Sequence, residues 1–190
     1  MTTEPSSTEP PPWRTPLLRA VPAIIVGLAI TFTADHSAAI GLVMFGAFGL
    51  ATALVLVLTS LRMRRDEPMR NLHRGLAMIA ALAGALALIV LATVGGGLAL
   101  LLLLVGGYAV LAGALEVVWG IRHRVAHPLA RDAIIIGIGT LAFAVVLAPV
   151  GDSVSAVGFF GAYAVVLGVF LLIASLSLKW STPVKESTTS

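Results

Sequence analysis

Six long apolar runs make up most of this chain of 190 residues and restrict the folds open to it. They cover residues 17–33, 38–61, 75–94, 97–119, 132–148 and 154–178. A helix needs about 20 residues, and at least about 17, to cross the hydrocarbon core of a bilayer. The runs do not alternate between polar and apolar residues as the strands of a membrane barrel do. The sequence therefore predicts an all-α membrane protein with six transmembrane helices.

The low charge content favours the same fold class. Hydrophobic residues make up 58% of the chain and charged residues only 11%, too few to cover the surface of a soluble domain. The formal net charge is +3, which we assign to loops on one side of a membrane and not to a nucleic-acid-binding surface. Cysteine is absent, so disulfides, thiolate nucleophiles and cysteine metal sites are excluded.

The segments that connect the runs alternate between two kinds. Asp35-His36, Gly95–Gly97 and Pro149–Asp152 are short turns without Lys or Arg, whereas residues 62–74 and 122–131 are basic loops. With six spans, all 12 Lys and Arg residues fall on one side, which the positive-inside rule makes cytoplasmic. Three tryptophans lie at the same predicted interface: Trp13, Trp119 and Trp180. We expect both termini and both basic loops to be cytoplasmic.

The two ends of the chain are polar and have little to bury. We expect residues 1–16 and 181–190 to be disordered cytoplasmic tails that flank a membrane domain at 17–180. Arg14 and Arg19 flank the start of the first run, and a cleavable signal is an alternative interpretation of it. We favour an uncleaved helix, because the repeat described next requires this run as half of a hairpin.

A pattern of small residues recurs in the second, fourth and sixth runs. It spans residues 106–113 and 161–168, with a more divergent copy at 46–53. Spacings of three and then four residues keep the small residues on one helical face: Gly46, Gly49 and Ala53; Gly106, Ala109 and Gly113; Gly161, Ala164 and Gly168. The sequence thus predicts three parallel-repeat helical hairpins, at 17–61, 75–119 and 132–178. We expect helices two, four and six to line the bundle centre through this face, where small residues let backbones approach.

Glu116 is the acidic residue most clearly placed within a predicted span, on the small-residue face. A charged side chain there usually faces protein or water. The functional interpretation is a proton-binding or ion-binding carboxylate. The structural interpretation is an ion pair with a cytoplasmic arginine such as Arg74 or Arg131, or a carboxylate that reaches the headgroups. Tyr108 and Tyr163 recur at equivalent places, where their hydroxyls bond across helices or line a polar cavity.

Asp35, His36 and Asp152 lie in the predicted external turns. They are candidate sensors of external acidity, because His titrates near pH 6.5 and Asp near 4; the structural alternative is that turns need polar residues. No histidine spacing fits a zinc motif, and the chain has no nucleophile elbow and no phosphate-binding loop. We expect no metal, no cofactor and no enzymatic activity.

Two stretches of the form Gly-x-Tyr-x-x-x-x-Gly, at 106–113 and 161–168, resemble the HdeD-like acid-resistance membrane proteins. Ala148-Pro149 with Gly151, and the basic end at residues 121–124, add to the likeness, which covers residues 17–180 and is firmest over 97–180. The first hairpin departs from it, with Phe48 in place of tyrosine, Ala53 in place of glycine and Asp35-His36 where the third hairpin has Pro149. The resemblance implies a bacterial inner-membrane protein linked to acid or envelope stress, and it carries no functional residues over.

Two functions follow as hypotheses. The first is a non-enzymatic integral membrane protein that supports acid or envelope stress tolerance through contacts with the membrane or a partner. Its partners would be the lipid bilayer, anionic lipids at the basic loops, and a second copy or another membrane protein; nucleic acid is not among them. The alternative is a small proton-coupled transporter or channel with Glu116 and the two tyrosines as its polar path. A conducting path needs a continuous polar line, whereas a structural protein needs Glu116 paired and the centre packed.

Overall fold

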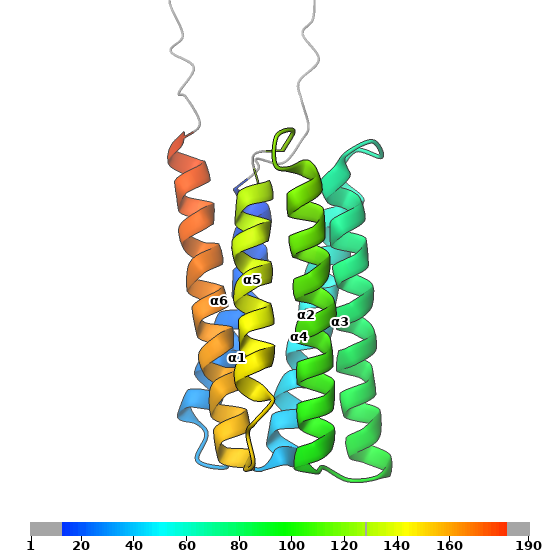
Figure 1. Ribbon diagram of the computed structural model, residues 1–190, viewed down its shortest axis with the longest axis vertical. Helices are drawn as coiled ribbons and strands as arrows, with labels where there is room; N and C mark the ends of the chain where they lie inside the picture. Colours follow the sequence, from blue (N-terminus) through cyan, green and yellow to red (C-terminus); the bar gives the residue numbers. More distant parts are fainter. Residues whose placement is uncertain (1–12, 128, 182–190) are drawn as a thin grey trace, which may run out of the picture.

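The computed structural model describes residues 13–127 and 129–181. This part of the chain forms six helices that lie side by side along one long axis, and no strand (Figure 1). The helices are α1 (Arg14–Phe32), α2 (Ala38–Arg62), α3 (Pro68–Thr93), α4 (Leu98–His123), α5 (Ala130–Leu147) and α6 (Ser153–Ser181). All six are long and apolar enough to cross a membrane. The predicted all-α class with six membrane helices is confirmed.

Two helix boundaries differ from the apolar runs. Helix α1 begins at Arg14, so residues 14–16, which we had assigned to the tail, are helical; residues 1–12 and 182–190 lie outside the described part. Helix α3 begins at Pro68, ahead of residue 75, because proline needs no N–H partner in the first turn and Glu67 before it is extended. Hydropathy locates only the apolar part of a helix, whereas the helical backbone can begin before that part.

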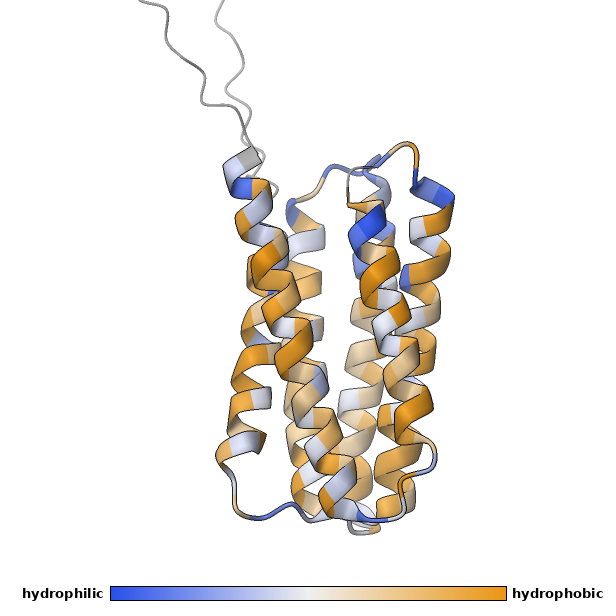
Figure 2. Ribbon diagram, turned by 60° about the vertical axis from the view of Figure 1, so that its left-hand side comes forward, coloured by the Kyte–Doolittle hydropathy of each residue, from blue (hydrophilic) through white to orange (hydrophobic). Residues whose placement is uncertain are grey.

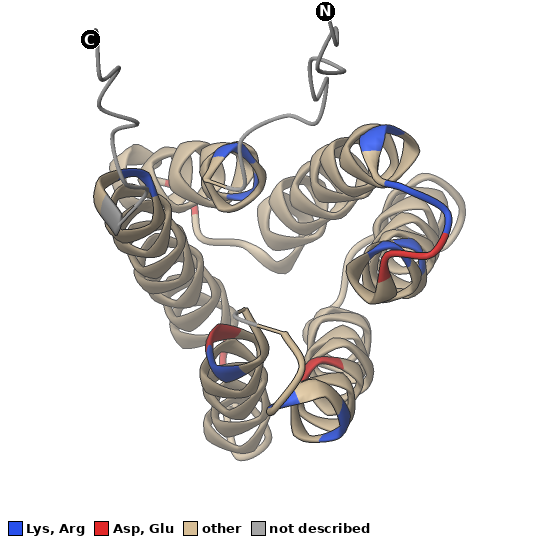
Figure 3. Ribbon diagram, turned by 90° about the horizontal axis from the view of Figure 1, so that it is seen from above, with Lys and Arg blue, Asp and Glu red and all other residues tan. Residues whose placement is uncertain are grey.

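Polar residues concentrate at the two ends of the bundle (Figure 2). One end, which we term the basic end, carries the loops at 63–67 and 124–127 together with the start of α1 and the end of α6; Lys and Arg gather there (Figure 3). The opposite end, the turn end, carries the connections at 33–37, 94–97 and 148–152. In the second of these, Gly95 has φ 85°, a conformation that glycine adopts without strain.

The closest packing joins helices of neighbouring predicted hairpins. Helix α2 packs most extensively on α3, α4 on α5, and α6 on α1, which closes the bundle into a ring (Figure 3). Helices α2, α4 and α6 also contact one another, whereas the described parts of α1, α3 and α5 do not. The bundle therefore has three inner and three outer helices.

The small-residue face meets the paired outer helix and not the centre, so that part of the prediction is wrong. A Cβ at Gly49 would lie 2.7 Å from the carbonyl oxygen of Ala80 in α3, and one at Gly113 would lie 2.8 Å from that of Gly137 in α5. Gly168 likewise lies against Ile24 of α1. Of the remaining small residues, Gly46 and Gly161 also meet the outer helix, Ala53, Ala109 and Ala164 are buried, and Gly106 has open space around it. Small residues are needed where two backbones come closest, and a space shared by three helices is wider.

Aromatic side chains fill that wider space in the half of the bundle nearer the turn end. Phe45 and Phe48 of α2 pack edge-to-face against Tyr108 of α4 and Phe160 of α6, with ring centroids 5.6–6.0 Å apart. All four rings are buried. Edge-to-face geometry at this spacing is favourable for aromatic rings. The inner helices do line the centre, through these large residues.

Candidate functional site

A buried ion pair crosses the centre of the bundle. The Nη2 of Arg19 in α1 donates to the Oε1 of Glu116 in α4 at 2.8 Å. Only 15% of the arginine side chain and 4% of the glutamate side chain are exposed. Their helices belong to different pairs and do not otherwise pack on each other. The two side chains therefore tie together parts of the ring that have no backbone contact.

The partner of Glu116 differs from the ones predicted. Arg74 and Arg131 are both exposed, on outward faces of α3 and α5, and neither reaches the carboxylate. Arg19 had been taken as a flanking residue of the first span. Its neighbour Ala20 is buried, with its backbone against Gly168 of α6, and the Arg19 side chain reaches into the bundle. The predicted ion pair of Glu116 with an arginine is therefore present, but the arginine is Arg19 and not Arg74 or Arg131.

An inner cavity lies beside the pair, towards the aromatic cluster. Hydroxyls from four helices line it, those of Thr52, Tyr108, Thr140 and Tyr163. The Thr140 Oγ1 donates to the carbonyl of Ile136 at 2.8 Å, so the Tyr163 hydroxyl, 2.9 Å away, must be the donor to Thr140. The cavity offers about 10 Å³ to the centre of a water molecule, close to the minimum that holds one water.

Thr52 is the unsatisfied member of this group. Its residue is 7% exposed, and its Oγ1 is buried without a hydrogen-bond partner among the described residues. A buried hydroxyl without a partner is destabilising by roughly 1–3 kcal/mol. Such a group indicates a place where a water, a proton donor or a ligand atom completes the site.

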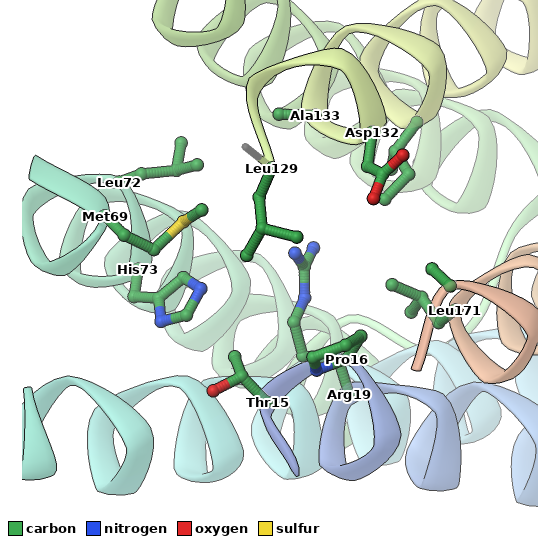
Figure 4. Close-up of a pocket in the computed structure, with 12 residues that line it drawn as sticks. Thr15, Pro16, Arg19, Met69, Leu72, His73, Leu129, Asp132, Ala133 and Leu171 are labelled. Atoms are coloured by element: carbon green, nitrogen blue, oxygen red, sulfur yellow. The ribbon is translucent and has the colours of Figure 1, made fainter. Parts of the chain in front are cut away.

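A second cavity, which we term the mouth pocket, lies between Arg19 and the basic end. It offers about 40 Å³ and is lined by α1, α3, α5, α6 and the residue before α5. Figure 4 shows the Arg19 guanidinium projecting into it, with His73 on one side and Asp132 on the other. Its lining residues are Thr15, Pro16, Arg19, Met69, Leu72, His73, Leu129, Asp132, Ala133, Ile136, Leu171 and Ala174. Arg19 and Ile136 line both cavities, so they form the partition between them.

The candidate acid-sensing residues lie at the turn end, and the described residues show no bond between the two turns that hold them. Asp35 Oδ1 accepts from the Ser37 N–H at 2.8 Å, and His36 beside it is half-buried. Asp152 Oδ1 accepts from the Ser155 N–H at 2.8 Å and so caps α6. These hydrogen bonds from Ser155 hold the pKa of Asp152 below its usual value. The carboxylate therefore stays ionised in mild acid.

A cluster at the basic end joins the two basic loops. Trp119 Nε1 donates to the carbonyl of Pro68 at 3.2 Å, and His127 Nε2 lies 3.1 Å from Glu67 Oε1. His123 stacks on the Trp119 ring at 4.6 Å. In the described part of the chain, no three side chains of metal-ligating type lie together. The cluster thus has a packing role that sequence spacing did not reveal.

No family model, curated protein or solved structure matches this chain. The resemblance to the HdeD-like proteins therefore stays an expectation drawn from the two tyrosine-containing stretches. The chemistry of the site rests on its own groups: the buried cation of Arg19, the buried anion of Glu116, and hydroxyls, of which that of Thr52 has no hydrogen-bond partner among the described residues.

Proposed function

We propose that this multi-pass membrane protein is non-enzymatic and supports acid or envelope stress tolerance in a bacterial inner membrane. The observation that supports this role over conduction is the closed centre. Glu116 is paired with Arg19, and Phe45, Phe48 and Phe160 fill the axis beyond Tyr108. A continuous polar line, which a conducting path needs, is interrupted by these rings.

The basic end faces the cytoplasm in this proposal and contacts anionic lipid headgroups. Eight arginines of the described residues are exposed there: Arg14, Arg62, Arg64, Arg65, Arg74, Arg122, Arg124 and Arg131. A basic residue near an anionic surface contributes about 1 kcal/mol to membrane attraction. The outward apolar faces contact lipid, and a second copy or another membrane protein is the remaining candidate partner.

Survival at low external pH tests the proposal. A strain that lacks the gene should lose viability and should be rescued by the wild-type protein and by Glu116→Gln at equal membrane levels. Rescue by both would support a role that needs the folded bundle and not a titrating carboxylate. Full survival of the deletion strain would refute the stress role.

The second candidate is a small proton-coupled transporter, and the inner cavity favours it. Its hydroxyls, among them the unpartnered one of Thr52, surround the Glu116 carboxylate, and the mouth pocket lies on the other side of Arg19. Proton flux into vesicles, abolished by Glu116→Gln in a folded protein, would move this candidate ahead of the first. Flux unchanged by that substitution would exclude it.

A further inference from the structure

Arg19 has hydrogen-bonding capacity that the chain does not use. A guanidinium carries five N–H donors, and the described residues give Arg19 a single hydrogen bond, from Nη2 to Glu116. Its guanidinium extends from α1 into the mouth pocket, between Leu129, Asp132 and Leu171 (Figure 4). Spare donors of a largely buried cation that face a cavity are suited to an acceptor from outside the chain.

The pocket limits the size and shape of that acceptor. Its volume of about 40 Å³ has room for about three water molecules, which corresponds to a solute of three or four heavy atoms. A planar guanidinium fork matches planar oxyanions such as a carboxylate, with two parallel hydrogen bonds. Most of the lining residues are apolar, and a hydrogen bond is electrostatically stronger in such surroundings than in water.

The charges around Arg19 determine what must accompany an anion. Helix α4 contributes Glu116, α5 contributes Asp132 at the pocket and α3 contributes His73, whose Nδ1 lies 3.4 Å from Thr59 Oγ1. Towards Glu116, α2 and α6 contribute neutral hydroxyls, those of Thr52 and Tyr163, and α4 also contributes Tyr108. One arginine cannot neutralise both Glu116 and a bound anion in a largely apolar space.

We propose that the mouth pocket binds a small planar monovalent oxyanion, of the size of acetate or nitrate, on Arg19, and that Glu116 takes up one proton with each anion. The anion replaces the carboxylate as partner of the guanidinium. The incoming proton enters from the basic end and rests on a Glu116 oxygen, so the site keeps the same net charge. The hydroxyl of the neutral acid then has an acceptor in the cavity it shares with Thr52, whose Oγ1 has no partner among the described residues.

Asp132 restricts the anion to a single charge. Its carboxylate lines the same pocket as Arg19, so a divalent anion would face a repulsion that one arginine does not offset. A free carboxylate solute and a carboxylate carried by a lipid would both bind Arg19 through the same chemical group. The small volume favours the free solute, because about 40 Å³ has room for only three or four heavy atoms.

Calorimetric titration of the purified full chain in lipid nanodiscs tests the proposal, with acetate and nitrate as probes between pH 6 and 8. We expect a Kd on the order of millimolar that falls about tenfold for each unit of falling pH, because one proton binds with each anion. Heats measured in two buffers of different ionisation enthalpy should report an uptake of one proton. A Kd that does not change with pH, or no binding of either anion, would overturn the proposal.

Two variants with matched controls separate this role from a structural one. Glu116→Gln should bind nitrate at pH 8 more tightly than the wild type does and without pH dependence, whereas Glu67→Gln at the basic end should keep the wild-type slope. Arg19→Leu should lose binding, and Arg74→Leu, at an exposed arginine, should keep it. If either site variant fails to fold, the pH slope and proton uptake of the wild type still decide. Decanoate that binds through Arg19 while acetate and nitrate do not would refute the free-solute assignment.

The proposal depends neither on the stress role nor on transport. Binding is measured on isolated protein, so loss of the survival phenotype and loss of anion binding are independent results.

Discussion

Arg19 and Glu116 should stabilise the bundle only as a pair, and a double-mutant cycle measures this. The changes are Arg19→Leu, Glu116→Leu and both together. Leucine suits both positions, because Leu76 and Ile136 line the inner cavity from the other outer helices as Arg19 does. Leu56 likewise lines it from an inner helix as Glu116 does.

The magnitude follows from burial. A charge left unpaired inside a membrane protein costs about 3 kcal/mol, and breaking a buried pair in soluble proteins costs roughly 3–5 kcal/mol. Replacing both partners by apolar residues is often neutral or stabilising. We therefore expect each single substitution to lower the free energy of unfolding by about 3 kcal/mol and the double substitution to change it by less than about 1 kcal/mol. The coupling energy is then about 5 kcal/mol.

The assay is unfolding of the purified protein in mixed micelles by titration with dodecyl sulfate, followed by helical circular dichroism and by tryptophan fluorescence, to which the buried Trp119 contributes. The same cycle at Arg64 and Asp66, an ion pair whose side chains are 70% and 76% exposed, is the control and should give less than about 1 kcal/mol of coupling. If the double substitution destabilises by the sum of the single ones, about 6 kcal/mol, the two charges act independently and the pairing argument is wrong.

Three further predictions rest on single contacts. Thr52→Val should raise the free energy of unfolding by about 1 kcal/mol in the same titration, because the buried hydroxyl has no partner; destabilisation would show that it has one. Gly49→Leu should weaken the pairing of α2 with α3, since a Cβ there lies 2.7 Å from the Ala80 carbonyl oxygen, whereas Gly106→Leu, with open space, should melt near the wild-type temperature. Asp152 has a lowered pKa in the folded protein, so its stabilising effect is present above the usual carboxyl pKa of about 3.9 and is lost as pH falls through the lowered value. Asp152→Ala should reduce this acid dependence of the melting temperature between pH 2 and 5, and an unchanged profile would contradict the capping role.

The sequence was sufficient to predict the six helices and to predict that Arg62, Arg64 and Arg122 gather at one end of the bundle. Span length and loop charge do not depend on which helices are neighbours. The sequence was also sufficient to find the small residues that share a helical face. It could not show which neighbour that face meets. Helical periodicity fixes the angle between side chains on one helix, whereas the rotation of each helix in the ring is set by packing with the others.

Arg19 was missed for the same reason. Three residues from the start of an apolar run, an arginine is equally compatible with a headgroup contact and with an inward position. The distinguishing feature is its neighbour Ala20, which is small, buried and in contact with Gly168 across the α1–α6 interface. The packing of α1 on α6 sets the rotation of α1 and thereby the direction of the Arg19 side chain. The pairing of α1 with α6, which joins the two ends of the chain, had to be known first.

The inner cavity shows how a nearly uniform framework acquires one polar site. Positions 19, 76 and 136 of the outer helices line it as Arg, Leu and Ile, and positions 52, 112 and 167 of the inner helices line it as Thr, Ala and Leu. Leucine, isoleucine and alanine at these equivalent positions show that the framework does not need charged residues there in order to pack. A charge pair that packing does not require is weak evidence for stability, since apolar replacements of similar volume are often as stable. We therefore attribute Arg19 and Glu116 to the anion binding proposed above and not to stability, so that anion binding, and not the melting temperature, tests the site.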